Sequence, residues 1–113
     1  MNCLFCDFAS GAKKPNVVLE TDDVLAFRDI SPKAPTHVLV IPKRHIASLN
    51  DLTPADAELV GRLFLAAKQV AAAEGIADSG YRTVFNTGRE AGQSVFHIHL
   101  HVMGGRAMDW PPG

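Results

Sequence analysis

The feature that most constrains the fold is a stretch in which histidine alternates with an aliphatic residue, His97-Ile-His99-Leu-His101. In a β-strand, successive side chains point to opposite faces of the sheet. A strand over residues 95–103 would therefore place all three imidazoles on one face. The opposite face would be apolar and buried in the core, made of Phe96, Ile98, Leu100 and Val102.

The rest of the chain predicts short strands and two helices. Apolar or alternating runs indicate strands at 17–20 and 24–29, joined as a hairpin, and at 37–41 and 81–87. Residues 4–10 predict a short helix that ends at Gly11. A longer helix begins at Thr53-Pro54 and runs to Glu74, with Gly75 as its stop. Together these elements favour an α+β fold with a mostly antiparallel sheet and helices covering one face.

Length and composition narrow the class of protein. With 113 residues, the chain is expected to form one domain, 1–113. Eleven Lys and Arg balance twelve Asp and Glu, which argues against a nucleic-acid partner. No apolar run approaches the roughly 18 residues of a membrane span, and the first residues lack the order of a signal peptide. We therefore expect a cytoplasmic protein that binds neither nucleic acid nor membrane.

Three histidines in one row favour chemistry over a polar sheet face that merely carries them. A neutral imidazole has a free ring nitrogen that can attack phosphorus or bind a metal. The outer two rings would stand about 13 Å apart along a strand, whereas a zinc–nitrogen bond is about 2.0 Å. One metal could therefore reach two neighbouring histidines but hardly all three. A catalytic zinc on His97 and His99 stays open as an alternative.

Both cysteines fall in one motif, Cys3-Leu-Phe-Cys6. The motif can be half of a tetrahedral zinc site, a redox pair, or two free buried thiols. No strand precedes it, which makes a redox role of the thioredoxin kind weak. Two thiolates need two further ligands, and His45 and His97 are the candidates for a closed site.

The stretch directly before the histidine strand carries polar groups. Asn86-Thr-Gly88 and Gly92-Gln-Ser94 bring amide, hydroxyl and backbone donors to this point of the chain. Such donors suit phosphate oxygens, although Asn, Gly and Ser also make ordinary turns.

The run from Gly92 to Val102, which contains the three histidines, resembles the signature of the histidine triad (HIT) superfamily. Residues 27–32, 34–45 and 104–113 are similar to its nucleotide-binding Hint branch, so the resemblance is nearly full length. The tail separates that branch from the Fhit-type dinucleoside polyphosphate hydrolases. The resemblance implies a HIT-like fold: a mostly antiparallel five-stranded sheet with two helices, in a homodimer with a continuous sheet.

The resemblance also implies an activity, namely hydrolysis of purine nucleoside phosphoramidates and of aminoacyl-adenylates. By that match His99 is the nucleophile and forms a covalent nucleotidyl intermediate, while His101 binds the phosphate and Ser94 assists protonation of the leaving nitrogen. Asn86 and Gln93 would stabilise the equatorial oxygens, and Asp29 would bind the ribose hydroxyls. The other implied contacts to the nucleotide are Leu4, Phe5, Phe8, Phe27, Ile30, His37, Leu39 and Val95.

Relatives that carry the Cys-x-x-Cys motif hold zinc on its thiols and two histidines, which supports a structural zinc at Cys3, Cys6, His45 and His97. Asp109 stands where the tail often has histidine, so leaving-group selectivity stays open. Two other functions remain as hypotheses. One is a non-catalytic nucleotide-binding or partner-binding scaffold, suggested by the small size and the apolar tail. The other is a dinucleoside polyphosphate hydrolase.

Overall fold

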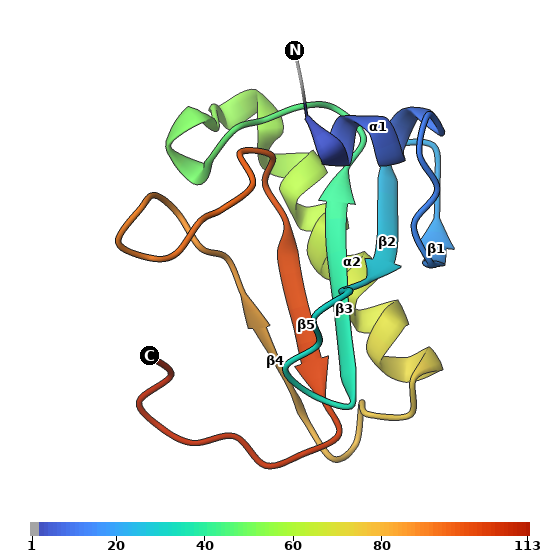
Figure 1. Ribbon diagram of the computed structural model, residues 1–113, viewed down its shortest axis with the longest axis vertical. Coiled ribbons are helices and arrows are strands. Elements are labelled where there is room, and N and C mark those ends of the chain that lie inside the picture. Colours follow the sequence, from blue (N-terminus) through green and yellow to red (C-terminus); the bar gives the residue numbers. More distant parts are fainter. Residues whose placement is uncertain (1–2) are drawn as a thin grey trace.

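A computed structural model, which describes residues 3–113, contains one five-stranded antiparallel sheet (Figure 1). Its strands are β1 (Val17–Glu20), β2 (Val24–Arg28), β3 (Thr36–Pro42), β4 (Tyr81–Val84) and β5 (Leu100–Gly104). Their order across the sheet is β1-β2-β3-β5-β4, and every neighbouring pair is antiparallel. The α+β class and the antiparallel sheet predicted from the sequence are confirmed.

Two helices flank this sheet. Helix α1 (Leu4–Ser10) ends at Gly11, whose φ of 84° is the left-handed conformation expected of a glycine at this position. Helix α2 (Ala57–Ala73) follows a 3-10 turn at Pro54–Asp56, where the Thr53 backbone N–H donates to the Asp56 carboxylate at 2.8 Å. Across residues 3–113, no helix is both long enough and apolar enough to cross a membrane.

The two helices pack on opposite faces of the sheet, which differs from the expectation that they cover one face (Figure 1). Val24 and Ala26 of β2 point to α2, whereas Leu25 and Phe27 point to the face that carries α1. The reason is that β2 is apolar on both of its faces, so the face opposite α2 also has to be covered, and this is done by α1. It buries one aromatic residue, Phe5, among the strand residues of its own face.

The strand predicted at 95–103 is shorter than expected, since β5 begins only at Leu100 and β4 ends at Val84. Residues 85–99 instead form a connection that leaves the sheet, and the Ile98 N–H donates to the Ile46 carbonyl at 2.8 Å. Phe96, predicted to be in the core, is 55% exposed. Ile98, Leu100 and Val102 are buried as predicted.

Candidate active site and metal centre

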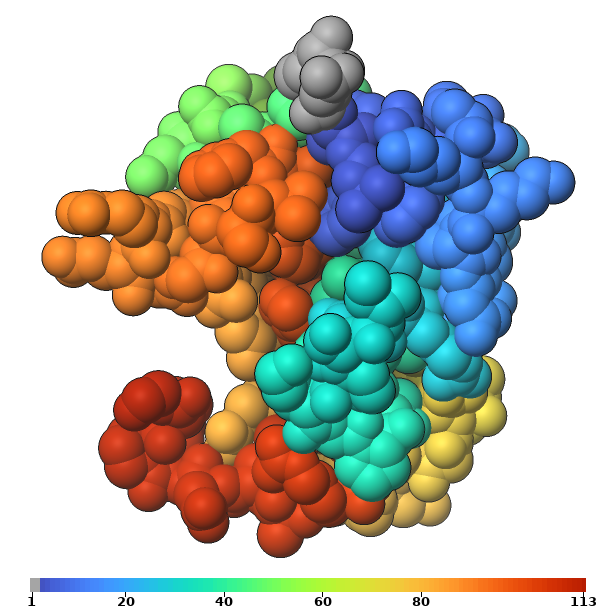
Figure 2. All heavy atoms as spheres, in the orientation of Figure 1, coloured from blue at the N-terminus to red at the C-terminus, as the bar shows by residue number. Residues whose placement is uncertain are grey.

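A cavity of about 700 Å³ lies on the α1 face of the sheet. Figure 2 shows this face hollowed between α1, the segment after β2 and the connection that leads into β5. All but three of the predicted nucleotide-binding residues line it: Leu4, Phe5, Phe8, Phe27, Asp29, Ile30, Leu39, Ser94, Val95, His99 and His101. The exceptions are His37, Asn86 and Gln93.

One wall of the cavity is aromatic. Phe27 of β2 meets Phe5 and Phe8 edge to face, with ring centroids 5.3 and 5.0 Å apart. The Phe5 ring also meets His99 edge to face at 5.2 Å. An apolar wall built of aromatic rings suits a flat aromatic group such as a nucleobase.

The backbone fixes which nitrogen of His99 carries the proton. His99 Nδ1 lies 2.8 Å from the His97 carbonyl oxygen, which can only accept, so Nδ1 is the protonated atom. In the neutral ring the lone pair is then on Nε2. Among residues 3–113 no hydrogen bond is made to His99 Nε2, and a buried imidazole in a cavity wall with a free lone pair can act as a nucleophile.

His101 and His37 form a hydrogen-bonded chain beside His99. The Lys33 backbone N–H donates to His37 Nδ1 at 3.0 Å, so the proton of the neutral ring is on Nε2. That nitrogen lies 2.9 Å from His101 Nδ1 and donates to it, which puts the His101 proton on Nε2. Within residues 3–113 this buried Nε2 has no hydrogen-bond partner. An unpartnered buried N–H in a ring that lines the cavity is suited to a ligand oxygen.

Burial keeps both rings of this chain neutral. It lowers the pKa of His101 to about 4, helped by the neighbouring His99 and His37 rings and opposed by Asp29. Burial also lowers the pKa of His37. Asp29, His37 and His101 come close enough to suggest a metal site. The hydrogen bond between the neutral rings of His37 and His101 already explains why their nitrogens lie 2.9 Å apart, so a metal ion is not needed to account for this cluster.

This depressed pKa predicts how stability depends on pH. An unfolded His101 takes up a proton near its ordinary pKa of about 6.5, whereas the folded ring does so only near 4. Between these values the unfolded state binds more protons, so the free energy of unfolding falls as the pH is lowered from about 6.5 to 4. One group contributes a slope of up to about 1.4 kcal/mol per pH unit.

Denaturant unfolding at several pH values in this window measures the slope. His101→Gln removes the contribution of this ring and should give a shallower pH dependence than the unchanged protein. Parallel slopes in the two proteins would contradict the assignment.

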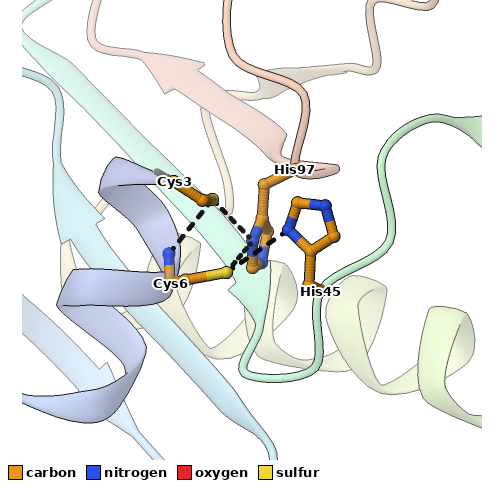
Figure 3. A group of neighbouring side chains, drawn as sticks. All are labelled: Cys3, Cys6, His45 and His97. Carbon is orange, nitrogen blue, oxygen red and sulfur yellow. Dashed lines mark hydrogen bonds between the residues drawn. The ribbon is translucent and has the colours of Figure 1, made fainter. Parts of the chain in front are cut away.

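A second cluster, drawn in Figure 3, joins the start of α1 to two distant parts of the chain. Cys3 is the N-cap residue of α1 and Cys6 lies in its first turn, His45 follows β3, and His97 precedes β5. The Sγ atom of Cys6 lies 3.3 Å from His45 Nδ1 and 3.5 Å from His97 Nδ1, and Cys3 Sγ lies 3.4 Å from the latter. The structure therefore groups His97 with the cysteines.

The donor set and its distances fit a tetrahedral metal ion. With zinc bonds of about 2.3 Å to sulfur and 2.0–2.1 Å to nitrogen, a tetrahedral site separates S and N ligands by about 3.6 Å. His97 Nε2 donates to the Pro42 carbonyl at 2.7 Å, which turns the lone pair of Nδ1 toward the thiols. His99 is not in this cluster, which argues against the alternative of a catalytic zinc on His97 and His99.

Gln93 does not line the cavity and is hydrogen-bonded within the chain. Its amide donates to the Ala47 carbonyl at 2.7 Å and to the Val95 carbonyl at 3.2 Å, and its oxygen accepts from the Gly88 N–H at 2.9 Å. The side chain is buried and anchors the connection before β5 to the segment after β3. Asn86 is half-buried in the same connection.

Five residues of the cavity lining were not predicted from the sequence: Lys14, Pro15, Asn16, Arg28 and Ser31. Three of them lie in the loop between α1 and β1. The signal that could have found them is position, because a loop that directly follows a wall-forming helix stays beside the same cavity.

Comparison with known proteins agrees with this geometry. The chain matches the HIT domain family over residues 10–108. It is 54% identical to a HIT family hydrolase from Legionella pneumophila, whose crystal structure superposes with a TM-score of 0.97 over 99% of this chain and 100% of that one. A histidine triad nucleotide-binding protein from Candida albicans is 29% identical, with a TM-score of 0.83 over 97% of this chain and 83% of that one.

A curated relative gives the same family without a function. An uncharacterized HIT-like protein of Synechococcus elongatus is 52% identical over 98 residues, which are 87% of this chain and 85% of that protein. The fold, the histidine row and these matches show that the chain belongs to the HIT domain family.

Proposed function

We propose that the protein hydrolyses purine nucleoside phosphoramidates, and aminoacyl-adenylates by the same route, through a nucleotide bound covalently to His99. The observation that carries the proposal is the His99 ring, whose Nδ1–H is held by the His97 carbonyl and whose Nε2 is free in the wall of the cavity. The aromatic wall beside it supports a nucleobase as the bound group.

The reaction has two displacements at phosphorus. The lone pair of His99 Nε2 forms a bond to the α-phosphorus as the P–N bond to the amine breaks, and the amine leaves with that electron pair and takes up a proton. In an aminoacyl-adenylate the P–O bond breaks instead, and the amino acid leaves as a carboxylate that needs no proton. Water then attacks phosphorus, the bond to Nε2 breaks, and the nucleoside monophosphate and the neutral imidazole are released. The positive charge that develops on the ring in the first step strengthens the hydrogen bond to the His97 carbonyl.

The other residues serve binding and proton transfer. The Nε2–H of His101 would donate to a phosphoryl oxygen and the Ser94 hydroxyl would protonate the leaving amine, while the Asp29 carboxylate would accept from the ribose hydroxyls. Asn86 would donate to the same phosphoryl group. The buried contacts of Gln93 favour a positioning role, in which its amide holds the connection that carries Ser94.

We further propose that Cys3, Cys6, His45 and His97 hold a structural zinc ion. The ion would cross-link α1 to the segments before β5 and after β3, and this chain offers it four side-chain ligands with no open position for substrate. The residues that act on the nucleotide are separate from it.

Release of nucleoside monophosphate from adenosine and guanosine phosphoramidates, followed by chromatography, tests the activity. Turnover by the folded protein is expected. Tight binding of the monophosphate without turnover would reject the phosphoramidase and favour the binding scaffold. Turnover of diadenosine polyphosphates alone would favour a dinucleoside polyphosphate hydrolase.

A homodimer with a continuous sheet is part of the proposal. Strand β4 is an edge of the sheet, and large apolar side chains are exposed on β4, α2 and the tail: Tyr81, Phe64, Leu65 and Trp110, the last 82% exposed. In Figure 2 the C-terminal tail stands apart from the connection before β5, which leaves a gap that a second subunit can fill. Sedimentation equilibrium is expected to give twice the mass of the chain, and a monomer at all concentrations would reject this assembly.

A further inference from the structure

The cavity has one end that the proposed chemistry does not use. Phe27, Leu39 and His101 lie opposite one another in a single row across β2, β3 and β5, and the row continues to Val17 at the start of β1. Three strand spacings of about 4.8 Å separate its two ends by about 14 Å. Lys14 and Asn16, just before Val17, line the end of the cavity that is farthest from the reactive histidines.

This order of residues assigns a part of the nucleotide to each part of the cavity. With the phosphate at the histidine end, as the proposed function requires, the base would lie along the aromatic wall of Phe5, Phe8 and Phe27 and point toward β1. Lys14 and Asn16 would then face the six-membered ring of the base, whose position 6 is distant from the sugar. The base is the only part of such a substrate that reaches them.

In the loop between α1 and β1, backbone hydrogen bonds fix the chain both before and after Lys14. The Lys13 backbone N–H donates to the Asp7 carbonyl at 3.1 Å, and the Asn16 carbonyl accepts from the Arg28 N–H at 3.0 Å. Pro15 fixes its own φ and restricts Lys14 to extended conformations. The backbone of Lys14 is thus constrained, although its side chain is exposed.

The charge of Lys14 has no partner in the part of the chain that the structure describes. Among residues 3–113 no carboxylate forms an ion pair with it, whereas the neighbouring Lys13 pairs with Asp7 at 3.6 Å and does not line the cavity. Lys14 is therefore a free cation beside an apolar slot. Its ammonium group has three donors and no acceptor.

We propose that Lys14 selects the base, favouring purines that carry a keto oxygen at position 6 over adenine. The bases differ at position 6, where guanine and hypoxanthine present the acceptor O6 and adenine presents the N6 amino donor, while all three carry the acceptor N7 beside it. An ammonium group can donate to both acceptors of guanine and hypoxanthine but meets a donor in adenine. The Asn16 amide has both donors and an acceptor, so it does not discriminate by itself. This inference rests on the proposed function and deepens it.

Calorimetric binding of GMP, IMP and AMP to the full chain tests the proposal. We expect GMP and IMP to bind about five- to tenfold more tightly than AMP, the lower part of the range for a base-edge contact because Lys14 is exposed. Equal binding of GMP and IMP would show that O6 is read, since IMP lacks the 2-amino group. Lys14→Ala should bring the ratio of GMP to AMP affinity close to one, and Lys14→Glu, which supplies acceptors to N6, should reverse it.

Lys13→Ala is the matched control and should keep the ratio of the unchanged protein. The same ratio in the Lys14→Ala variant, or equal affinity for GMP and AMP in the unchanged protein, would overturn the inference while leaving the proposed hydrolysis intact. Failure to bind any of the three nucleotides, or to hydrolyse either phosphoramidate, would instead reject the proposed function.

Discussion

Replacement of His99 by alanine is expected to lower turnover of a nucleoside phosphoramidate by at least about 10⁴-fold, the scale on which loss of a nucleophile acts. The variant loses His99 Nε2, the ring nitrogen in the cavity wall whose lone pair is free because Nδ1 carries the proton and donates to the His97 carbonyl. Nucleotide binding should persist, because the aromatic wall and Asp29 are unchanged. Single-turnover kinetics and calorimetric binding of the monophosphate measure the two properties separately.

His99→Asn provides a stricter form of this experiment. Its amide N–H can keep the hydrogen bond to the His97 carbonyl, but it has no nucleophilic ring nitrogen. It should therefore fold and bind nucleotide like the unchanged protein and be as inactive as the alanine variant. Activity within a few-fold of the unchanged protein in either variant would contradict the assignment of His99.

Loss of the metal site is the second change with a large expected effect. Cys6→Ser, or removal of metal with a chelator, should lower the free energy of unfolding by about 3 kcal/mol or more, since binding to a structural site contributes directly to folding. The reason lies in α1, which is short and is tied by Cys3 and Cys6 to two distant histidines. Denaturant unfolding together with elemental analysis of the purified protein measures the effect.

Ser10→Ala is the control on the same helix, because its exposed hydroxyl touches none of the four residues: it donates to the Asp7 carbonyl at 3.2 Å and accepts from the Ala12 N–H at 3.3 Å. It should change stability little. Burial, with Cys3 beside it, raises the pKa of Cys6 to about 11 in the absence of metal. Metal binding must then displace a proton and should weaken as the pH falls. Equal stability with and without chelator would show that the four residues hold no structural ion.

The alternation of histidine with apolar residues was sufficient to predict the two faces of the sheet at β5. Ile98, Leu100 and Val102 are in the core, and His99 and His101 line the cavity, as period-2 geometry requires. The Cys-x-x-Cys motif predicted a metal cluster because few other soft donors exist in the chain. Gly11 marked the end of α1 correctly, whereas Pro54 marks the start of the 3-10 turn that leads into α2, so α2 itself begins at Ala57, later than predicted.

What the sequence could not predict depends on contacts between distant segments. Phe96 fits the alternating pattern, yet the chain before β5 leaves the sheet to bring His97 to the cysteines, and Phe96 is exposed as a result. The protonated nitrogens of His37, His97 and His99 are set by the Lys33 N–H and by the carbonyls of Pro42 and His97, which only the folded chain brings into place. Lys14 belongs to no sequence motif, so its place beside the cavity could not be predicted from the sequence.

The central claim is that His99 carries the nucleotide during the reaction, and mass spectrometry of the protein quenched during turnover at neutral or alkaline pH tests it most directly. We predict a mass increase of one nucleoside monophosphate, located by fragmentation on His99 and missing in His99→Asn. Turnover with no adduct, or with the adduct on another residue, would contradict the account.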